Sequence, residues 1–278
     1  MPGIQKFQLP PHHQAFVERF VQVCQADDRV VASFLGGSNV KGTADEYSDV
    51  DLTVITTDAS YEEFYNQRRQ FLESLGGLVF LENFEIPEIA FYIFADGTDG
   101  ELNFACESRM DHLQPGPFHV LLDKKNVLSG IEFPEKQPYV SDQTEKLRRN
   151  LYGFWHEMSH FTTAIGRGQL WWAGGQLEAL RSICVNLARL QNDFSDKGVG
   201  EEPYFKIENA MPVEKLASLK TTFCPMERNA MLQSAQVIVQ FYAQVGQLLA
   251  QAHGIPYPHR LESLMLDHFK KLSKRATT

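Results

Sequence analysis

The sequence predicts an α+β protein in which a small mixed-sheet domain is followed by a C-terminal helical bundle. Two observations lead to this prediction. In the first part of the chain, short β-branched and aromatic runs alternate with turns and with two amphipathic segments. In the second part, long segments show helical periodicity and few β-branched clusters. We therefore expect a sheet domain over residues 1–130, a linker over 131–142 and a helical domain over 143–278.

The sheet domain is expected to open with a helix over 11–26, followed by a buried strand over 29–35 that ends at two glycines. A second strand is expected over 51–58. The segment 60–77 begins with a serine suited to capping and ends on glycines, which predicts a helix. The remaining strands are expected in this order: 78–84, 88–95 and 101–107, the last two joined by the turn DGTDG.

The character of the chain changes after the polar, proline-bearing stretch that we expect to be the linker. Helical periodicity predicts four long helices, over 143–165, 169–192, 226–252 and 258–273. The third is the clearest, because a long amphipathic run ends at Gly254 and Pro256. These helices are expected to pack as a bundle.

The composition is that of a soluble globular protein, with 278 residues, 43% apolar and 22% charged. No apolar run reaches the roughly 18 residues that a membrane span needs, and the N-terminus lacks a signal-peptide pattern. The four cysteines are far apart and form no C-x-x-C pair. We therefore expect a reduced, cytoplasmic protein with no membrane partner.

The net charge of −9 is unevenly distributed. Residues 1–140 hold 22 acidic and 10 basic side chains, or −12, whereas residues 141–278 hold 13 and 16, or +3. An acidic front half repels a phosphate backbone, so nucleic acid is not the expected partner. The same charge suits a divalent metal or a cationic small molecule, although a merely solvated acidic surface is an equally simple explanation.

The stretch LGGSNVKGTADEYSDVDLTV (35–54) contains the strongest functional signal. The turn Gly36–Gly37–Ser38 follows a strand and presents backbone N–H groups, which suits a phosphate, although Gly-Gly-Ser is also a common loop sequence. Asp49 and Asp51 are one residue apart on a predicted strand, so both side chains point to one face. Two adjacent carboxylates repel each other unless a cation lies between them, and Mg²⁺ is the cation that oxygen ligands and phosphates favour.

The two halves of this stretch also stand at a particular spacing. The run G-S-N-V-K-G-T-A-D-E-Y-S-D-V-D-L resembles the signature of the nucleotidyltransferase superfamily related to DNA polymerase β. It is most similar to the antibiotic adenylyltransferases, whose pattern is approximately G-S-x-A-x-G-x(5)-S-D-x-D-L. The matching positions are Gly37, Ser38, Gly42, Ser48, Asp49, Asp51 and Leu52, and Val40 replaces the usual alanine.

The resemblance implies a third carboxylate on a later strand. Glu101 stands where relatives usually have aspartate, Asn103 lies two residues on, and Glu107 is the second choice. By the same resemblance, Asp49, Asp51 and Glu101 hold one or two Mg²⁺ ions and perform catalysis.

The nucleotide would be bound by Gly37, Ser38, Asn39 and Ser48. The implied reaction moves a nucleoside monophosphate, AMP from ATP, onto a hydroxyl of a small molecule such as an antibiotic and releases pyrophosphate. We expect a monomer or a homodimer. A catalytically degenerate member that only binds a nucleotide or a protein partner is the alternative.

The helical half offers candidates for the acceptor side. Trp171 and Trp172 are able to stack on a ring, and Glu178 forms an i, i+3 pair with Arg181 beside them. The competing interpretation places both tryptophans in the core and assigns the charged pair to helix stability.

The stretch HEMSH (156–160) spells the zinc-protease pattern H-E-x-x-H and predicts His156 and His160 on one helix face. Glu178 is a candidate third ligand, so a zinc metallohydrolase is a further alternative. The simpler interpretation is that the two histidines flank the core residues Trp155 and Phe161 in the bundle, because no neighbouring sequence continues a metalloprotease pattern.

Overall fold

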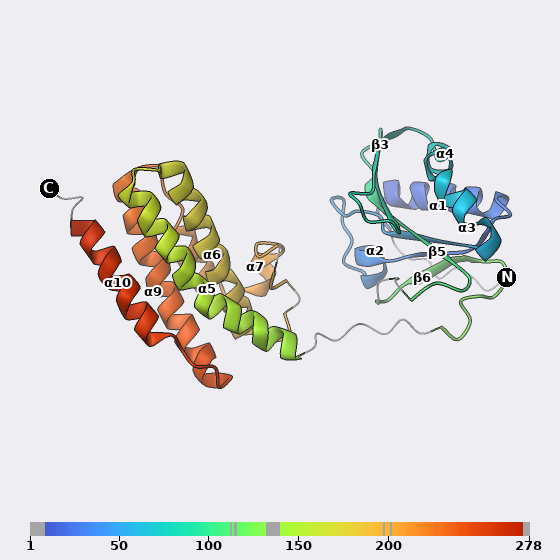
Figure 1. The fold of residues 1–278 in the computed structure, drawn as a ribbon. Helices are drawn as coiled ribbons and strands as arrows, with labels where there is room; N and C mark the ends of the chain where they lie inside the picture. Colours follow the sequence, from blue (N-terminus) through green and yellow to red (C-terminus); the bar gives the residue numbers. More distant parts are fainter. Residues whose placement is uncertain are drawn as a thin grey trace. The chain divides into compact units, whose positions relative to one another are not determined.

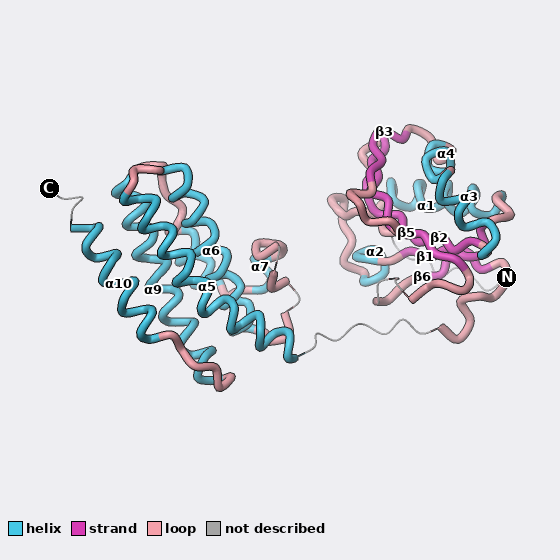
Figure 2. Tube along the Cα trace, viewed as in Figure 1, coloured by secondary structure: helices cyan, strands magenta, loops and turns pink. Residues whose placement is uncertain are grey.

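The computed structural model describes residues 9–111, 113, 116–131, 140–196, 198–200 and 202–274. Their contacts divide the chain into two compact units, Met1–Lys136 and Gln137–Thr278. The first unit is a sheet with helices, and the second is a bundle of helices (Figure 1). The described residues of the second unit contain helices and loops but no strand (Figure 2). This is the α+β architecture that the sequence predicts.

The first unit contains one six-stranded sheet with the strand order β3-β4-β5-β2-β1-β6. Neighbouring strands are antiparallel except β2 and β5, which run parallel. The strands are β1 (Val30–Leu35), β2 (Leu52–Thr56), β3 (Leu78–Glu82), β4 (Ile89–Phe94), β5 (Asp99–Cys106) and β6 (His119–Asp123).

The helices of the first unit contribute to a single hydrophobic cluster on one face of the sheet. The long helix is α1 (Pro11–Ala26), and the short ones are α2 (Gly37–Lys41), α3 (Tyr61–Asn66) and α4 (Arg68–Glu73), with a 3-10 turn η1 (Asp58–Ser60) before α3. Phe16 and Phe20 of α1 share this cluster with Val54 of β2 and Phe104 of β5. The cluster fixes which face of each strand is buried under helices.

The opposite face of the sheet carries a smaller apolar cluster that includes Phe34, Ile55 and Ala105. Side chains alternate along a strand, so the residues two and four positions before Ile55 and Ala105 also point to this second face. Those residues are Thr53 and Asp51 on the β2 side, and Asn103 and Glu101 on β5. The pleat of the sheet therefore gathers the predicted acids on the face that the helices leave open.

The second unit is built around four long helices, which are α5 (Val140–Gly166), α6 (Leu170–Asn192), α9 (Arg228–Ala252) and α10 (His259–Lys274). Two short helices, α7 (Ile207–Ala210) and α8 (Val213–Lys220), lie between α6 and α9 in the chain. Their apolar faces form one core in which Trp155 and Phe161 are fully buried and Phe154 stacks on Tyr242 at 3.8 Å between ring centroids. No described helix is both long and apolar enough to cross a membrane.

Several sequence predictions need correction. The segment 60–77 is not one helix capped by Ser60. Thr57 accepts the Ser60 N–H at 3.2 Å, so the helical turn starts before Ser60. The helix is also interrupted at Gln67, which separates α3 from α4. The strand β6 was not expected. Residues 132–139 of the predicted linker lie outside the described residues, and its last three residues belong to α5.

The position of the two aspartates relative to the strand also needs correction. β2 begins at Leu52, so Asp49 and Asp51 lie in the segment before the strand and not within it. This segment is nevertheless extended along the sheet, because Val50 N–H donates to Asp99 O at 2.9 Å and Gly36 N–H donates to Asp51 O at 2.9 Å. Val50 and Leu52 are buried as predicted.

Candidate active site

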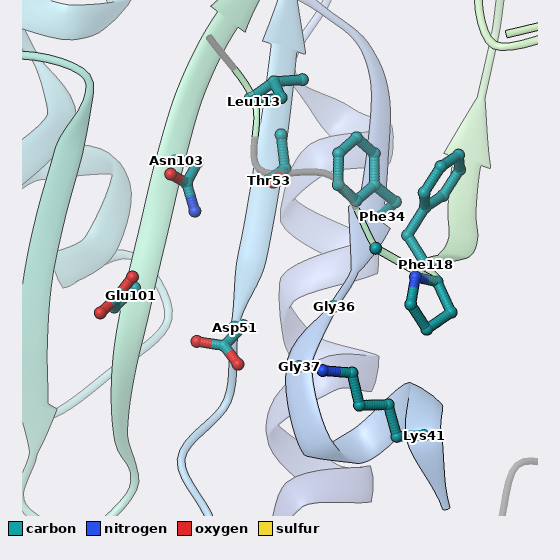
Figure 3. A pocket seen from close by; sticks show the side chains of 12 residues that line it. Phe34, Gly36, Gly37, Lys41, Asp51, Thr53, Glu101, Asn103, Leu113 and Phe118 are labelled. Carbon is teal, nitrogen blue, oxygen red and sulfur yellow. The ribbon is translucent and has the colours of Figure 1, made fainter. Parts of the chain in front are cut away.

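A pocket of about 240 Å³ opens on the face of the sheet that carries the predicted acids (Figure 3). Asp51 and Glu101 face the same space in it, and the amine of Lys41 points toward the turn at Gly37 (Figure 3). The pocket is lined by Phe34, Gly36, Gly37, Lys41, Asp51, Thr53, Glu101, Asn103, Leu113, Gly116, Pro117 and Phe118. It is therefore acidic at one end and apolar at the other.

The register of the two parallel strands brings Asp51 beside Glu101. Leu52 pairs with Leu102 and Thr53 with Asn103, so the residues just before these pairs are also neighbours. On the other side of β5, Phe91 pairs with Glu101. Asp51 and Glu101 are 50 positions apart in the sequence, and only the pairing of β2 with β5 makes them adjacent.

The glycine turn packs closely against Asp51. Gly37 begins α2 with a φ of +63°, a conformation that glycine adopts without strain. A Cβ at Gly37 would lie 1.7 Å from Asp51 Oδ2, so no larger residue fits while the carboxylate keeps its place. The turn and the Asp51 carboxylate occupy adjoining space, which explains why position 37 is a glycine.

Val50, the residue between Asp49 and Asp51, is held in place on several sides. The Tyr92 hydroxyl donates to Val50 O at 2.5 Å, from a side chain that is 1% exposed. A Cβ at Gly100 would lie 2.2 Å from Val50 O, so Gly100 lets the β4–β5 hairpin approach this carbonyl. The Val50 side chain is buried. The backbone that carries Asp49 and Asp51 is therefore fixed at its centre.

The two carboxylates that line the pocket, Asp51 and Glu101, are repelled by each other and by the exposed Asp49 nearby. Burial raises the pKa of Asp51 to about 7, the negative charges of Asp49 and Glu101 add to the rise, and Lys41 opposes it. Burial, followed by the charge of Asp49, also raises the pKa of Glu101. Both shifts mean that the ionised forms are destabilised here, which is the electrostatic condition that a bound cation relieves.

Serine 38 presents a hydroxyl that the fold leaves without a partner. Its Oγ is buried and has no hydrogen-bond partner among the described residues. Burying a polar group without a hydrogen bond is unfavourable, so the fold alone leaves the hydrogen-bonding capacity of this hydroxyl unsatisfied.

Two predicted nucleotide-binding side chains are engaged within the protein instead. The Asn39 amide donates to Asp49 O at 2.8 Å and its oxygen lies 3.1 Å from His13 Nδ1. The Ser48 hydroxyl accepts from Asp45 N–H at 3.0 Å and donates to the Asp45 carboxylate at 3.2 Å. These bonds stabilise the loop that carries Asp49, and nucleotide binding by Asn39 and Ser48 stays a prediction.

Glu107, the second choice for a third carboxylate, lies at the opposite end of β5 from Asp51. Its N–H donates to Thr56 O, at the far end of β2, and its carboxylate pairs with Lys125 Nζ at 3.0 Å. Of the two acids considered, Glu101 is the one that shares the pocket with Asp51.

The donor set of the pocket is compatible with Mg²⁺. Among the described residues, no three histidine, cysteine or acidic side chains form a ready-made metal cage. Mg²⁺ does not need one, because it is usually bound by one or two carboxylates together with substrate phosphates and water. Asp51 and Glu101 offer oxygen ligands, and the raised pKa of Asp51 shows that its negative charge lacks a sufficient counter-charge; both features fit a metal that binds together with a triphosphate.

Sequence reasoning missed several residues of this site. Phe34, Phe118 and Thr53 line the pocket. Of these, only Thr53 could have been predicted from the sequence, because side chains alternate along a strand and Thr53 therefore points to the same face as Asp51. For Lys41 the sequence favours an exposed loop lysine over one that assists with a phosphate; the structure shows that it lines the pocket and is also exposed. Tyr92 could not have been found, because its contact with Val50 spans two strands that are distant in sequence.

The predicted acceptor-side residues lie on α6 of the second unit. Trp171 is 86% exposed and Trp172 is 36% exposed, so neither is a core residue. Glu178 forms an ion pair with Arg181, as predicted, and Arg181 is buried and donates to Thr222 Oγ1 at 2.8 Å. The two exposed indoles are available for binding, and their role and that of Glu178 stay predictions.

The HEMSH stretch lies on α5. His156 and His160 do share one face, with their Nε2 atoms 3.4 Å apart, and Glu157 Oε1 lies 3.1 Å from His156 Nδ1. Trp155 and Phe161 beside them are fully buried. Glu178 pairs with Arg181 and not with the histidines. In the described part of the chain, the zinc-hydrolase alternative therefore finds no third ligand.

The pKa of Asp51 leads to a prediction about stability. In metal-free protein, Asp51 ionises near its ordinary value of 3.8 when unfolded and near 7 when folded. Between these values the folded state holds one more proton, so stability is lost as the pH rises. Thermal unfolding in EDTA should show Asp51→Asn gaining stability over the wild type from about pH 4 to 7.

Glu46→Gln, at an exposed acid of the same loop, is the control and should leave the pH dependence unchanged. Parallel wild-type and Asp51→Asn curves across this pH range would show that Asp51 ionises normally in the folded protein.

Comparison with known proteins places this site in a family. The family model described as streptomycin adenylyltransferase matches residues 12–272. Among solved structures, an aminoglycoside 6-adenyltransferase from Bacillus subtilis is similar over 93% of this chain and 96% of its own length, with 14% identity and a TM-score of 0.40. No curated protein sequence matches the chain. Because the family match spans nearly the whole chain, the protein belongs to the streptomycin adenylyltransferase family and is a nucleotidyltransferase.

Proposed function

We propose that the protein transfers AMP from Mg-ATP to a hydroxyl group of a small cationic molecule of the aminoglycoside type and releases pyrophosphate. The observation that carries the proposal is the placement of Asp51 beside Glu101 in one pocket, directly against the glycine turn at Gly37. Family membership supports nucleotidyl transfer, and the pocket supports the assignment of roles to residues.

Asp49 and Asp51 are the residues that we assign to holding Mg²⁺, with Glu101 as an additional ligand or as the base. When bound, Mg²⁺ neutralises charge on the triphosphate and makes the α-phosphorus a better electrophile. The turn at Gly37 and the unpartnered Ser38 hydroxyl are assigned to the triphosphate. Lys41 lines the same pocket and adds a positive charge near the phosphates.

Glu101 is suited to accept the proton of the attacking hydroxyl. Its pKa is raised by burial and by Asp49, which makes it a better proton acceptor than an ordinary glutamate. The acceptor oxygen forms a bond to the α-phosphorus, the bond from that phosphorus to the bridging oxygen breaks, and pyrophosphate leaves. The proton passes to Glu101 and then to solvent.

The charge of the protein supports a cationic acceptor. Residues 1–140 have a net charge of −12, from 22 acidic and 10 basic side chains. A field of this sign raises the local concentration of a polyamine-like molecule near the pocket. The exposed Trp171 and Trp172, with Glu178, are the side chains that we assign to the acceptor on the helical unit.

The first test removes the two aspartates. Asp49→Asn and Asp51→Asn should each abolish pyrophosphate release from Mg-ATP in the presence of a panel of aminoglycosides, because an amide binds Mg²⁺ and orients a triphosphate far less well than a carboxylate. Glu46→Gln should retain wild-type release. Wild-type rates in both aspartate variants would refute the assignment, and Mg-ATP binding without turnover in the wild type would favour a degenerate, binding-only member.

The second test uses a matched pair of glycines. Gly37 and Gly42 have similar φ values, +63° and +69°, so alanine strains both backbones alike. Only at Gly37 does the new Cβ collide with Asp51, whereas nothing lies within 4 Å of a Cβ at Gly42. Gly37→Ala should lower kcat/KM by about a hundredfold, the effect of a displacement of about 1 Å in a catalytic group, while Gly42→Ala should stay much closer to wild type. Equal losses in steady-state assays would mean that strain, and not the position of Asp51, controls activity.

A further inference from the structure

A buried polar chain links helix α1 to the loop that carries Asp49. His13 is 1% exposed and Asn39 is 2% exposed, and His13 Nδ1 lies 3.1 Å from Asn39 Oδ1. The Asn39 amide nitrogen donates to Asp49 O at 2.8 Å. Three residues from α1, α2 and the segment before β2 are thereby joined by two hydrogen bonds.

The directions of these bonds follow from the chemistry of the amide. Asn39 donates its NH₂ group to a carbonyl, so its oxygen faces His13 and needs a donor. His13 therefore carries its hydrogen on Nδ1. An apolar residue in place of His13 would leave the Asn39 oxygen buried without a partner, which is unfavourable.

The two aspartates are positioned by different means. Asp51 is held by its own backbone bond to Gly36 and by contact of its side chain with the turn at Gly37. Asp49 is exposed and stands three residues before β2 begins, after the turn that Asp45 and Ser48 form. Its carbonyl receives the amide of Asn39, so the position of Asp49 depends on Asn39 and, through Asn39, on His13.

We propose that His13 is a positioning residue of the transferase, which holds the Asp49 backbone through Asn39 and so sets the geometry of the metal-triphosphate site. The inference rests on the proposed function, in which Asp49 is a Mg²⁺ ligand. His13 touches neither substrate nor metal in this role. Residues that orient metal ligands in this indirect way typically change metal affinity or activity by about 10–100-fold when removed.

The experiment measures the Mg²⁺ concentration that gives half-maximal pyrophosphate release at saturating ATP and acceptor. His13→Leu should raise this concentration by about tenfold or more and leave the KM of the acceptor unchanged. Thr56→Val is the control for loss of a buried hydrogen bond, since Thr56 is 1% exposed and its hydroxyl donates to Ala105 O at 3.4 Å. This variant should keep the wild-type Mg²⁺ dependence.

Two further variants test whether the nitrogen at the position of His13 Nδ1 is the atom required. They also guard against misfolding of His13→Leu. In His13→Asn, the side-chain nitrogen takes the place of Nδ1 and should restore the wild-type Mg²⁺ dependence. In His13→Gln, the nitrogen lies one bond farther out, near the place of Nε2, and the variant should behave like His13→Leu. Asn and Gln variants with the same Mg²⁺ dependence would overturn the proposal.

Asp49→Asn in the same assay distinguishes a failure of the inference about His13 from a failure of the proposed function. If Asp49→Asn abolishes turnover but all His13 variants match the wild type, the inference about His13 is wrong and the proposed function stands. If Asp49→Asn itself keeps the wild-type rate and Mg²⁺ dependence, the proposed function is wrong.

Discussion

Repulsion among Asp49, Asp51 and Glu101 is the constraint that the structure around the pocket has to withstand. Burial and the two neighbouring charges raise the pKa of Asp51 to about 7, so the folded protein holds these carboxylates together at an energetic disadvantage. The cluster is maintained because the surrounding backbone leaves it little freedom. In the proposed function, a cation that binds together with the substrate relieves this repulsion.

The surrounding structure supplies this constraint from several directions. The parallel pairing of β2 with β5 sets Glu101 beside Asp51, and Gly37 makes room for the Asp51 carboxylate. Tyr92 holds the carbonyl of Val50 from within the core. Each contact comes from a different element, so the fold of the whole unit determines the geometry of the pocket. The positions of the few charged residues in the pocket therefore depend on the six-stranded sheet as a whole.

The sequence predicts the local part of this arrangement better than the long-range part. The spacing of Gly37, Asp49 and Asp51 was readable because all three lie within one turn and one extended segment. Glu101 was found through the resemblance to a family, since its position beside Asp51 depends on a strand pairing that no local pattern encodes. The hydrogen bonds of Asn39 and Ser48 within the protein could not be predicted for a related reason. A motif indicates which residues gather in a loop, but only packing decides which of them bind one another.

Calorimetric titration of the protein with ATP, with and without Mg²⁺, tests the central claim most directly. The claim is that the acid cluster accepts a triphosphate only together with a cation, because the polyanion and the carboxylates otherwise repel each other. The account predicts clear binding of ATP with Mg²⁺ and much weaker binding in EDTA. Equal affinity under the two conditions would contradict it, since the carboxylates would then play no part in holding a metal-bound triphosphate.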